Sequence, residues 1–171
     1  MTNASSADPL AETARLAGFF AAHAIWSLSS GEALVPIYGF LRGAGLRELT
    51  RLEHDDLEAG VAAGRELLRS NEVSAQHAVL VFDGQVKLGE ESLDAVVIEG
   101  QSQAAADERL EMIVPYRSAA HADGFRVHPP KFVDLAGSQE RRLTLSQAFF
   151  RGVNEHREAA PIWRDHAAES R

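Results

Sequence analysis

The middle of the chain consists of short β-rich runs that follow one another with no helix between them. These runs span residues 78–82, 85–88, 93–100, 109–117 and 124–133, and Asp83-Gly84 is read as a turn between the first two. Parallel strands need crossover connections of about a dozen residues or more, usually helical, and the connectors here are too short for amphipathic helices. The block therefore predicts antiparallel pairing and excludes a βαβ core.

Three helices are predicted around this block. The first covers residues 8–23, where Asp8 can cap the helix and apolar residues recur at three- and four-residue spacing. The second covers 55–70 and begins at Asp55, in a sequence typical of a capping box. The third covers 143–158 and carries apolar residues along one stripe.

The segment between the first two helices is predicted to form a hairpin. Residues 25–28 and 34–41 are β-rich and flank the turn-like stretch 29–32. Pro36 predicts that the second run lies at a sheet edge or carries a bulge. Residues 46–52 form either a third strand or a helix, because their residue types favour both.

These elements predict one α+β domain. Its mostly antiparallel sheet has about six to seven strands, and the N-terminal, central and C-terminal helices pack mainly on one face. We expect residues 1–7 to be disordered and residues 8–171 to form this single domain. At 171 residues with 45% hydrophobic content and no cysteine, the chain can bury a core without disulfides or a thiolate metal site.

The charge of the chain is acidic and unevenly distributed. The formal net charge is −8, which disfavours a protein that holds nucleic acid or an anionic membrane by charge. Residues 52–111 carry 14 acids against four bases, whereas residues 112–171 carry seven acids against nine bases. Charge polarity of this kind can orient contacts between subunits, but solvated surfaces of a helix and of strands are the preferred explanation.

The chain is expected to be cytoplasmic. It shows no basic region followed by an apolar run at its start, and its longest apolar tract, 16–26, is too short to span a bilayer. Of the 17 basic residues, 15 are arginine, which is typical of a G+C-rich coding sequence and indicates a bacterial source.

One group of acidic residues predicts a magnesium site. Asp83 follows one strand, Asp94 lies on a later one, and Glu99-Gly-Gln101 ends that strand. In outline this resembles the core of the PD-(D/E)xK nucleases, with Gln101 in the lysine position. The resemblance implies that Asp83, Asp94 and Glu99 hold Mg²⁺, which prefers oxygen ligands. A hairpin turn at Asp83 and a solvent-facing Glu99 are the alternative.

A second group of residues is basic and surrounds the last predicted hairpin. If 109–117 pairs with 124–133, alternation places Arg126 and His128 on one face, and Arg117 and Lys131 lie nearby. Such a cluster can bind a carboxylate or phosphate group. The alternative is a polar outer face on an antiparallel sheet.

No nucleophile elbow, P-loop, dinucleotide fingerprint or paired histidine motif occurs in the chain, and no cofactor is predicted. The adjacent Phe149 and Phe150 point about 100° apart on a helix, so one of them, or Trp163, is free to cover a partner subunit. We therefore expect a non-catalytic binding or adaptor domain that forms a homodimer. The alternatives are a magnesium-dependent nuclease and a small-anion-binding protein.

Overall fold

A computed structural model describes residues 7–43 and 45–168 of the chain, so the predicted disorder of residues 1–7 lies almost wholly outside the described part. Within that part, seven strands form one antiparallel sheet in the order β2-β1-β3-β4-β5-β6, with β7 also paired to β5. The strands are β1 (Ile37–Leu41), β2 (Arg47–Arg51), β3 (His77–Leu88), β4 (Glu91–Ser102), β5 (Arg109–Arg117), β6 (Arg126–Val127) and β7 (Lys131–Phe132). The predicted α+β class and antiparallel sheet are confirmed.

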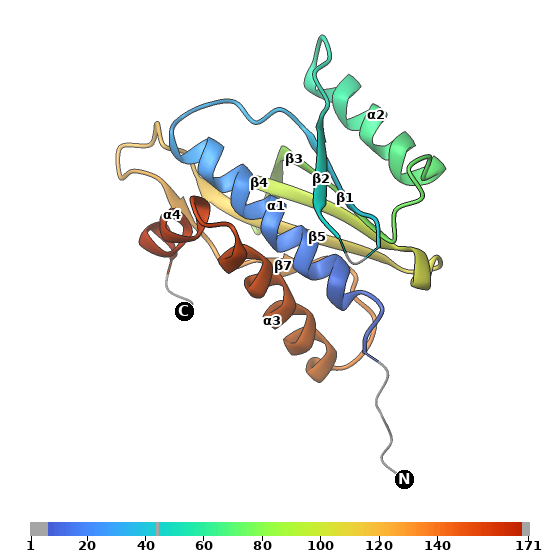
Figure 1. Ribbon diagram of the computed structural model, residues 1–171. Coiled ribbons are helices and arrows are strands. Elements are labelled where there is room, and N and C mark those ends of the chain that lie inside the picture. The colour runs from blue at the N-terminus through green and yellow to red at the C-terminus, as the bar shows by residue number, and fades with distance from the viewer. Residues whose placement is uncertain (1–6, 44, 169–171) are drawn as a thin grey trace.

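Four α-helices pack on this sheet within the described residues. They are α1 (Ala11–Ser29), α2 (Leu57–Ser70), α3 (Gln139–Glu155) and α4 (Ala159–His166), and a short 3₁₀ turn, η1 (Gln103–Ala105), follows β4. Helices α1, α3 and α4 lie together over one face, and α2 lies apart from them (Figure 1). The larger hydrophobic core forms beneath the three helices, and a smaller core forms between α2 and the other face of β1 and β3.

Helices α1 and α3 touch backbone to backbone. A Cβ atom at Gly18 would collide with the carbonyl of Phe149, and one at Gly152 would collide with the carbonyl of Arg15. Only glycine allows this approach, which brings the N-terminal and C-terminal parts of the chain into one layer.

Helix α1 is longer than predicted. It continues through 25–28 to Ser29, because Ile25 and Leu28 extend its buried stripe toward the sheet. The predicted hairpin around 29–32 is therefore wrong, and the real hairpin joins β1 to β2. Of the two structures left open for residues 46–52, the strand is the one that forms, and it pairs with β1 at the edge of the sheet.

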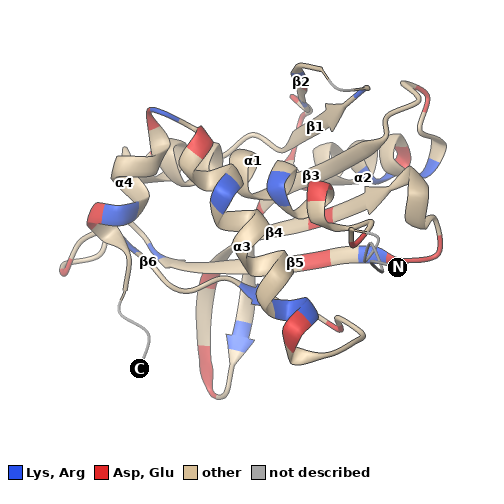
Figure 2. Cartoon of the chain, turned by 60° about the horizontal axis from the view of Figure 1, so that its bottom comes forward, with Lys and Arg blue, Asp and Glu red and all other residues tan. Residues whose placement is uncertain are grey.

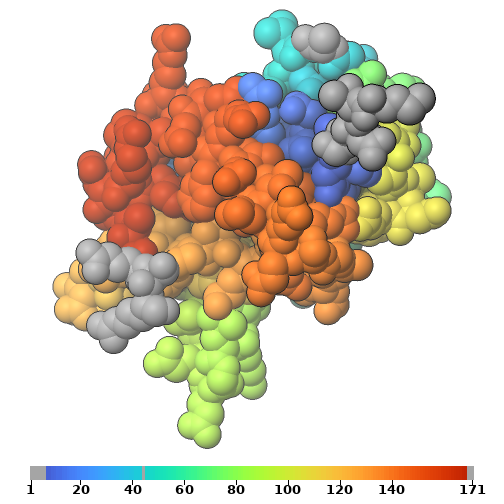
Figure 3. Space-filling model, turned by 90° about the horizontal axis from the view of Figure 1, so that it is seen from below, coloured from blue at the N-terminus to red at the C-terminus, as the bar shows by residue number. Residues whose placement is uncertain are grey.

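The prediction of a turn at Asp83-Gly84 is also wrong, because β3 continues through both residues to Leu88. The chain turns only at Gly89, whose φ of 68° favours glycine. The β3–β4 hairpin is consequently long, and its tip projects from the body of the protein (Figures 2 and 3). The central helix also begins one residue later than predicted, since it is Asp56 that accepts the hydrogen bond of the Ala59 N–H.

Candidate functional site

The face of the sheet opposite α1 is only partly covered. Helix α2 packs mainly against β3 and β1. Beyond α2 the side chains of β4, β5 and β7 on this face line open hollows in the surface. One of these hollows, of about 600 Å³, brings together the four basic residues singled out in the sequence.

We call this hollow the cationic pocket. Arg117 and Arg126 are direct cross-strand partners on β5 and β6, and His128 lies two residues after Arg126, with its N–H bonded to the Pro115 carbonyl. Lys131 is the partner of Ile113 on the same face. The remaining walls are mainly apolar and come from Leu88, Leu93, Pro115, Pro129, Pro130 and Ala168.

The four basic groups of the cationic pocket are not equivalent. The Arg117 guanidinium donates to the carbonyls of Gly124 (2.7 Å) and Asp123 (2.8 Å), which fixes it against its own loop. Arg126 and Lys131 are exposed, and within the described residues neither makes an ion pair. Their positive charges are therefore available to a ligand.

Burial lowers the pKa of the His128 imidazole from its ordinary value of 6.5, and the nearby Arg126 and Arg117 lower it further. A bound anion would oppose the repulsion from these arginines and raise the pKa again. The pocket can therefore hold a carboxylate or phosphate group and take up a proton on binding it.

The predicted magnesium site does not form, because its three carboxylates lie on opposite faces of the sheet. Asp83 and Asp94 lie on the α1 face, since their cross-strand partners are Val96 and Tyr116. Glu99 lies on the α2 face, opposite Leu80. Among the described residues no group of three His, Asp or Glu side chains is placed to hold a metal ion.

The acidic residues and Gln101 of that prediction have structural partners. Glu99 forms a bidentate ion pair with Arg65 of α2, and the Gln101 side-chain amide donates to the carbonyl of Leu68 at the end of α2. Both residues thus fasten α2 to β4. Asp83 accepts a 2.7 Å hydrogen bond from the Tyr116 hydroxyl, and burial raises the pKa of both groups.

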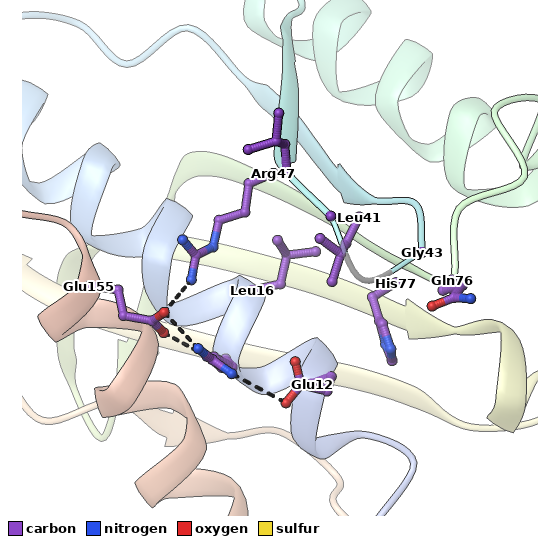
Figure 4. A pocket seen from close by; sticks show the side chains of 11 residues that line it. Glu12, Leu16, Leu41, Gly43, Arg47, Gln76, His77 and Glu155 are labelled. Atoms are coloured by element: carbon purple, nitrogen blue, oxygen red, sulfur yellow. Dashed lines mark hydrogen bonds and ion pairs between the residues drawn. The ribbon is translucent and has the colours of Figure 1, made fainter.

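A second basic pocket, of about 660 Å³, lies on the α1 face between α1, the β1–β2 hairpin and the start of β3 (Figure 4). Here Arg15 donates to both carboxylate oxygens of Glu155 (2.6 and 2.7 Å), and Arg47 donates to one of them (2.7 Å). These hydrogen bonds lower the pKa of Glu155 to about 2. Arg15 is thus paired with Glu155 and, at 3.6 Å, with Glu12, whereas Arg47 shares the Glu155 carboxylate with Arg15.

Two histidine contacts were not foreseen from the sequence. His77 Nδ1 lies 2.8 Å from the Thr13 hydroxyl beside the pocket of Figure 4, and His23 Nδ1 lies 3.0 Å from Nε2 of the buried His156. Burial lowers the pKa of all three histidines. The partners are 64 and 133 residues apart, so no local spacing could have revealed them.

The aromatic side chains near the C-terminus diverge as predicted. Phe149 and Trp163 are buried, whereas Phe150 is 39% exposed and packs edge-on against both rings. Phe150 is therefore the member of this group that is free to contact a partner.

No protein-family model, no curated protein and no solved structure matches this chain. Across residues 7–43 and 45–168, none of the helices combines the length and apolar character that crossing a bilayer requires.

Proposed function

We propose that this chain is a non-catalytic binding protein whose ligand carries a carboxylate or phosphate group next to an apolar portion. The observation that supports it is the cationic pocket, where basic side chains of β5, β6 and β7 converge while Arg126 and Lys131 lack ionic partners among the described residues. Charges placed together without partners repel one another, and a bound anion removes that cost.

The walls of the pocket define the rest of the ligand. Leu88 and Leu93, on the β3–β4 hairpin, and the rigid Pro115 present apolar surface beside the basic groups. A ligand with an apolar portion would remove this surface from water, at about 25 cal/mol per Å². Inorganic phosphate alone would use only the charges, so an amphipathic anion fits the pocket better.

The homodimer remains part of this proposal. Phe150 and Leu143 are exposed one heptad apart on α3, where a partner helix could cover both. Sedimentation at micromolar concentration tests this part separately. A monomer would remove the dimer and leave the ligand site untouched.

Straight-chain carboxylates from acetate to decanoate, together with inorganic phosphate, test the ligand site by calorimetry. We expect affinity to rise about threefold to fourfold per methylene, because each buried methylene contributes about 0.8 kcal/mol. Arg126→Ala should abolish binding of every member. The matched variant Arg109→Ala, an exposed arginine at the other end of β5, should bind normally.

The pH dependence of the same titrations supplies an independent readout. Because a bound anion raises the pKa of His128, the affinity should increase as the pH falls below 6.5, and His128→Gln should flatten this profile. Absence of heat and of thermal stabilisation with every carboxylate and with phosphate would rule out the anion site.

A further inference from the structure

Strand β2 ends the sheet with a free edge. Among residues 7–43 and 45–168 its only neighbour is β1, and the hydrogen bond from the Leu52 N–H to the Pro36 carbonyl (2.8 Å) identifies which of its residues face that neighbour. In an antiparallel pair the bonded residues alternate, so the even-numbered residues of β2 bond to β1. Arg47, Leu49 and Arg51 consequently direct their backbone N–H and C=O groups away from the sheet.

The side chains of these three residues lie on the α1 face, since their partners in β1 face that helix. Leu49 is 46% exposed, and Trp26 of α1 is 40% exposed. Both line a hollow of about 320 Å³ whose other apolar walls are Ala33, Leu34, Val35 and Ile37. An exposed tryptophan and an exposed leucine thus stand beside a row of unpaired backbone groups, an arrangement suited to β-strand addition.

We propose that the β2 edge binds an extended segment of another protein, in which an apolar residue is flanked at alternate positions by acidic residues. The apolar side chain would enter the hollow beside Leu49 and Trp26. Arg51 is exposed and has no ion pair within the described residues, and Arg47 retains donors beyond its single bond to Glu155. Carboxylates opposite these two arginines would match the charge of the edge.

A second copy of the chain fits this edge less well. Antiparallel pairing of two β2 strands about Leu49 places Arg47 opposite Arg51 at both ends, and like charges opposite one another are destabilising. A shift of two residues removes that clash but sets Leu49 against Arg51. The one acidic residue that lines the hollow, Glu32, belongs to the linker between α1 and β1 and not to β2. Pairing of two β2 strands therefore does not place it opposite the arginines.

The probe for this proposal is the peptide acetyl-Ser-Thr-Glu-Thr-Leu-Thr-Glu-Thr-Ser-amide, and its control is the same peptide with lysine at both glutamate positions. Binding is followed by the fluorescence of Trp26 in a Trp163→Phe background, which leaves Trp26 as the single tryptophan. We expect saturable binding of the acidic peptide, and binding at least about tenfold weaker for the lysine peptide.

Two variants separate backbone pairing from side-chain contact. Leu49→Pro removes only a backbone N–H that points away from β1, so the protein should still fold while peptide binding falls at least about tenfold. The control Leu49→Val keeps both the N–H and an apolar side chain, so it should bind the peptide normally. If Leu49→Pro does not fold, the charge reversal Arg51→Glu decides. An acid at position 51 repels one glutamate of the acidic peptide and attracts one lysine of the control peptide, so this variant should lose the preference for the acidic peptide.

Failure of both peptides to bind, or binding that Leu49→Pro and Arg51→Glu leave unchanged, would overturn the proposal. A dimer in sedimentation that Leu49→Pro dissociates would also overturn it, in favour of a second copy at this edge. None of these results depends on the cationic pocket, which lies on the other face of the sheet.

Discussion

On one face of the sheet three helices bury the central side chains of β3, β4 and β5, whereas on the other face α2 packs mainly against β1 and β3. The two faces also treat charge differently. On the covered face Arg15 and Arg47 share the carboxylate of Glu155, and on the open face Arg126 and Lys131 make no ion pair within the described residues. Arg15 and Arg47 thus contribute to the fold, whereas Arg126 and Lys131 are available for a ligand.

We therefore expect substitutions in the core and in the Arg15–Arg47–Glu155 network of the covered face to reduce the free energy of unfolding, and substitutions of Arg126 or Lys131 on the open face to reduce ligand binding alone.

Gly152→Ala should be the most damaging change. The new methyl group would meet the backbone of Arg15 rather than a side chain that can move, so α1 and α3 must separate. We expect a loss of about 3 kcal/mol in urea denaturation, at the upper end for overpacking. In the matched variant Gly84→Ala, on β3, the new atom lies 3.1 Å from the Val97 side chain, and we expect less than about 1 kcal/mol. Similar losses of unfolding free energy in Gly152→Ala and Gly84→Ala would contradict the expected difference between the two faces.

Glu155→Gln should cost about 2 kcal/mol, less than a fully buried ion pair because the network is partly exposed. The pKa of Glu155 lies at about 2 in the folded protein and near 4.5 in the unfolded chain. Its contribution to stability is therefore present above pH 4.5 and is lost as the pH falls toward 2. Stability curves of wild type and Glu155→Gln should converge in that range.

The control for Glu155 is Arg126→Ala on the open face, which should change the unfolding free energy by less than about 0.5 kcal/mol. A loss as large as that of Glu155→Gln would mean that the cationic pocket also stabilises the fold. The expected difference in stability effects between the two faces would then be wrong.

The smallest effect is expected from the histidine pair on the covered face. Because the Ala159 N–H donates to Nδ1 of His156, Nε2 carries the proton and donates to His23. Burial lowers the pKa of both rings below 6.5; Arg51 beside His23 and Arg47 beside His156 add to this, while Glu158 opposes it.

The unfolded chain consequently takes up protons first, so stability should be complete above pH 6.5 and decline as the pH falls below it. Thermal melts between pH 7.5 and 5.5 measure this decline, and His156→Gln should reduce it. A wild-type melting temperature that is constant across the range would show that the pair does not titrate.

The parts of the fold that depend on local spacing could be predicted. The strands between 78 and 133 pair in sequence order, and the basic residues of the last hairpin meet because alternation and register fix them. The magnesium prediction is wrong because it did not apply this alternation to Asp83. Asp83 was predicted to lie in a turn, whereas it lies inside β3 with its side chain on the face opposite to that of Glu99.

The end of α1 and the pocket of Figure 4 depend on distant partners instead. Residues 25–28 were predicted to form a strand, and the helix is favoured because Ile25 and Leu28 are buried in the core shared with α3 and α4. Glu155 meets Arg15 from 140 residues away, and nothing near either residue marks the pair.

The close contact between α1 and α3 has a consequence for the order in which the protein is completed. Helix α1 is synthesised before α3, yet the backbone surface that closes over Gly18 belongs to residues 139–155. The apolar stripe of α1 therefore remains only partly covered by the strands until α3 has been synthesised more than a hundred residues later. Helix α1 precedes the sheet on the chain, but its packing is completed after the sheet.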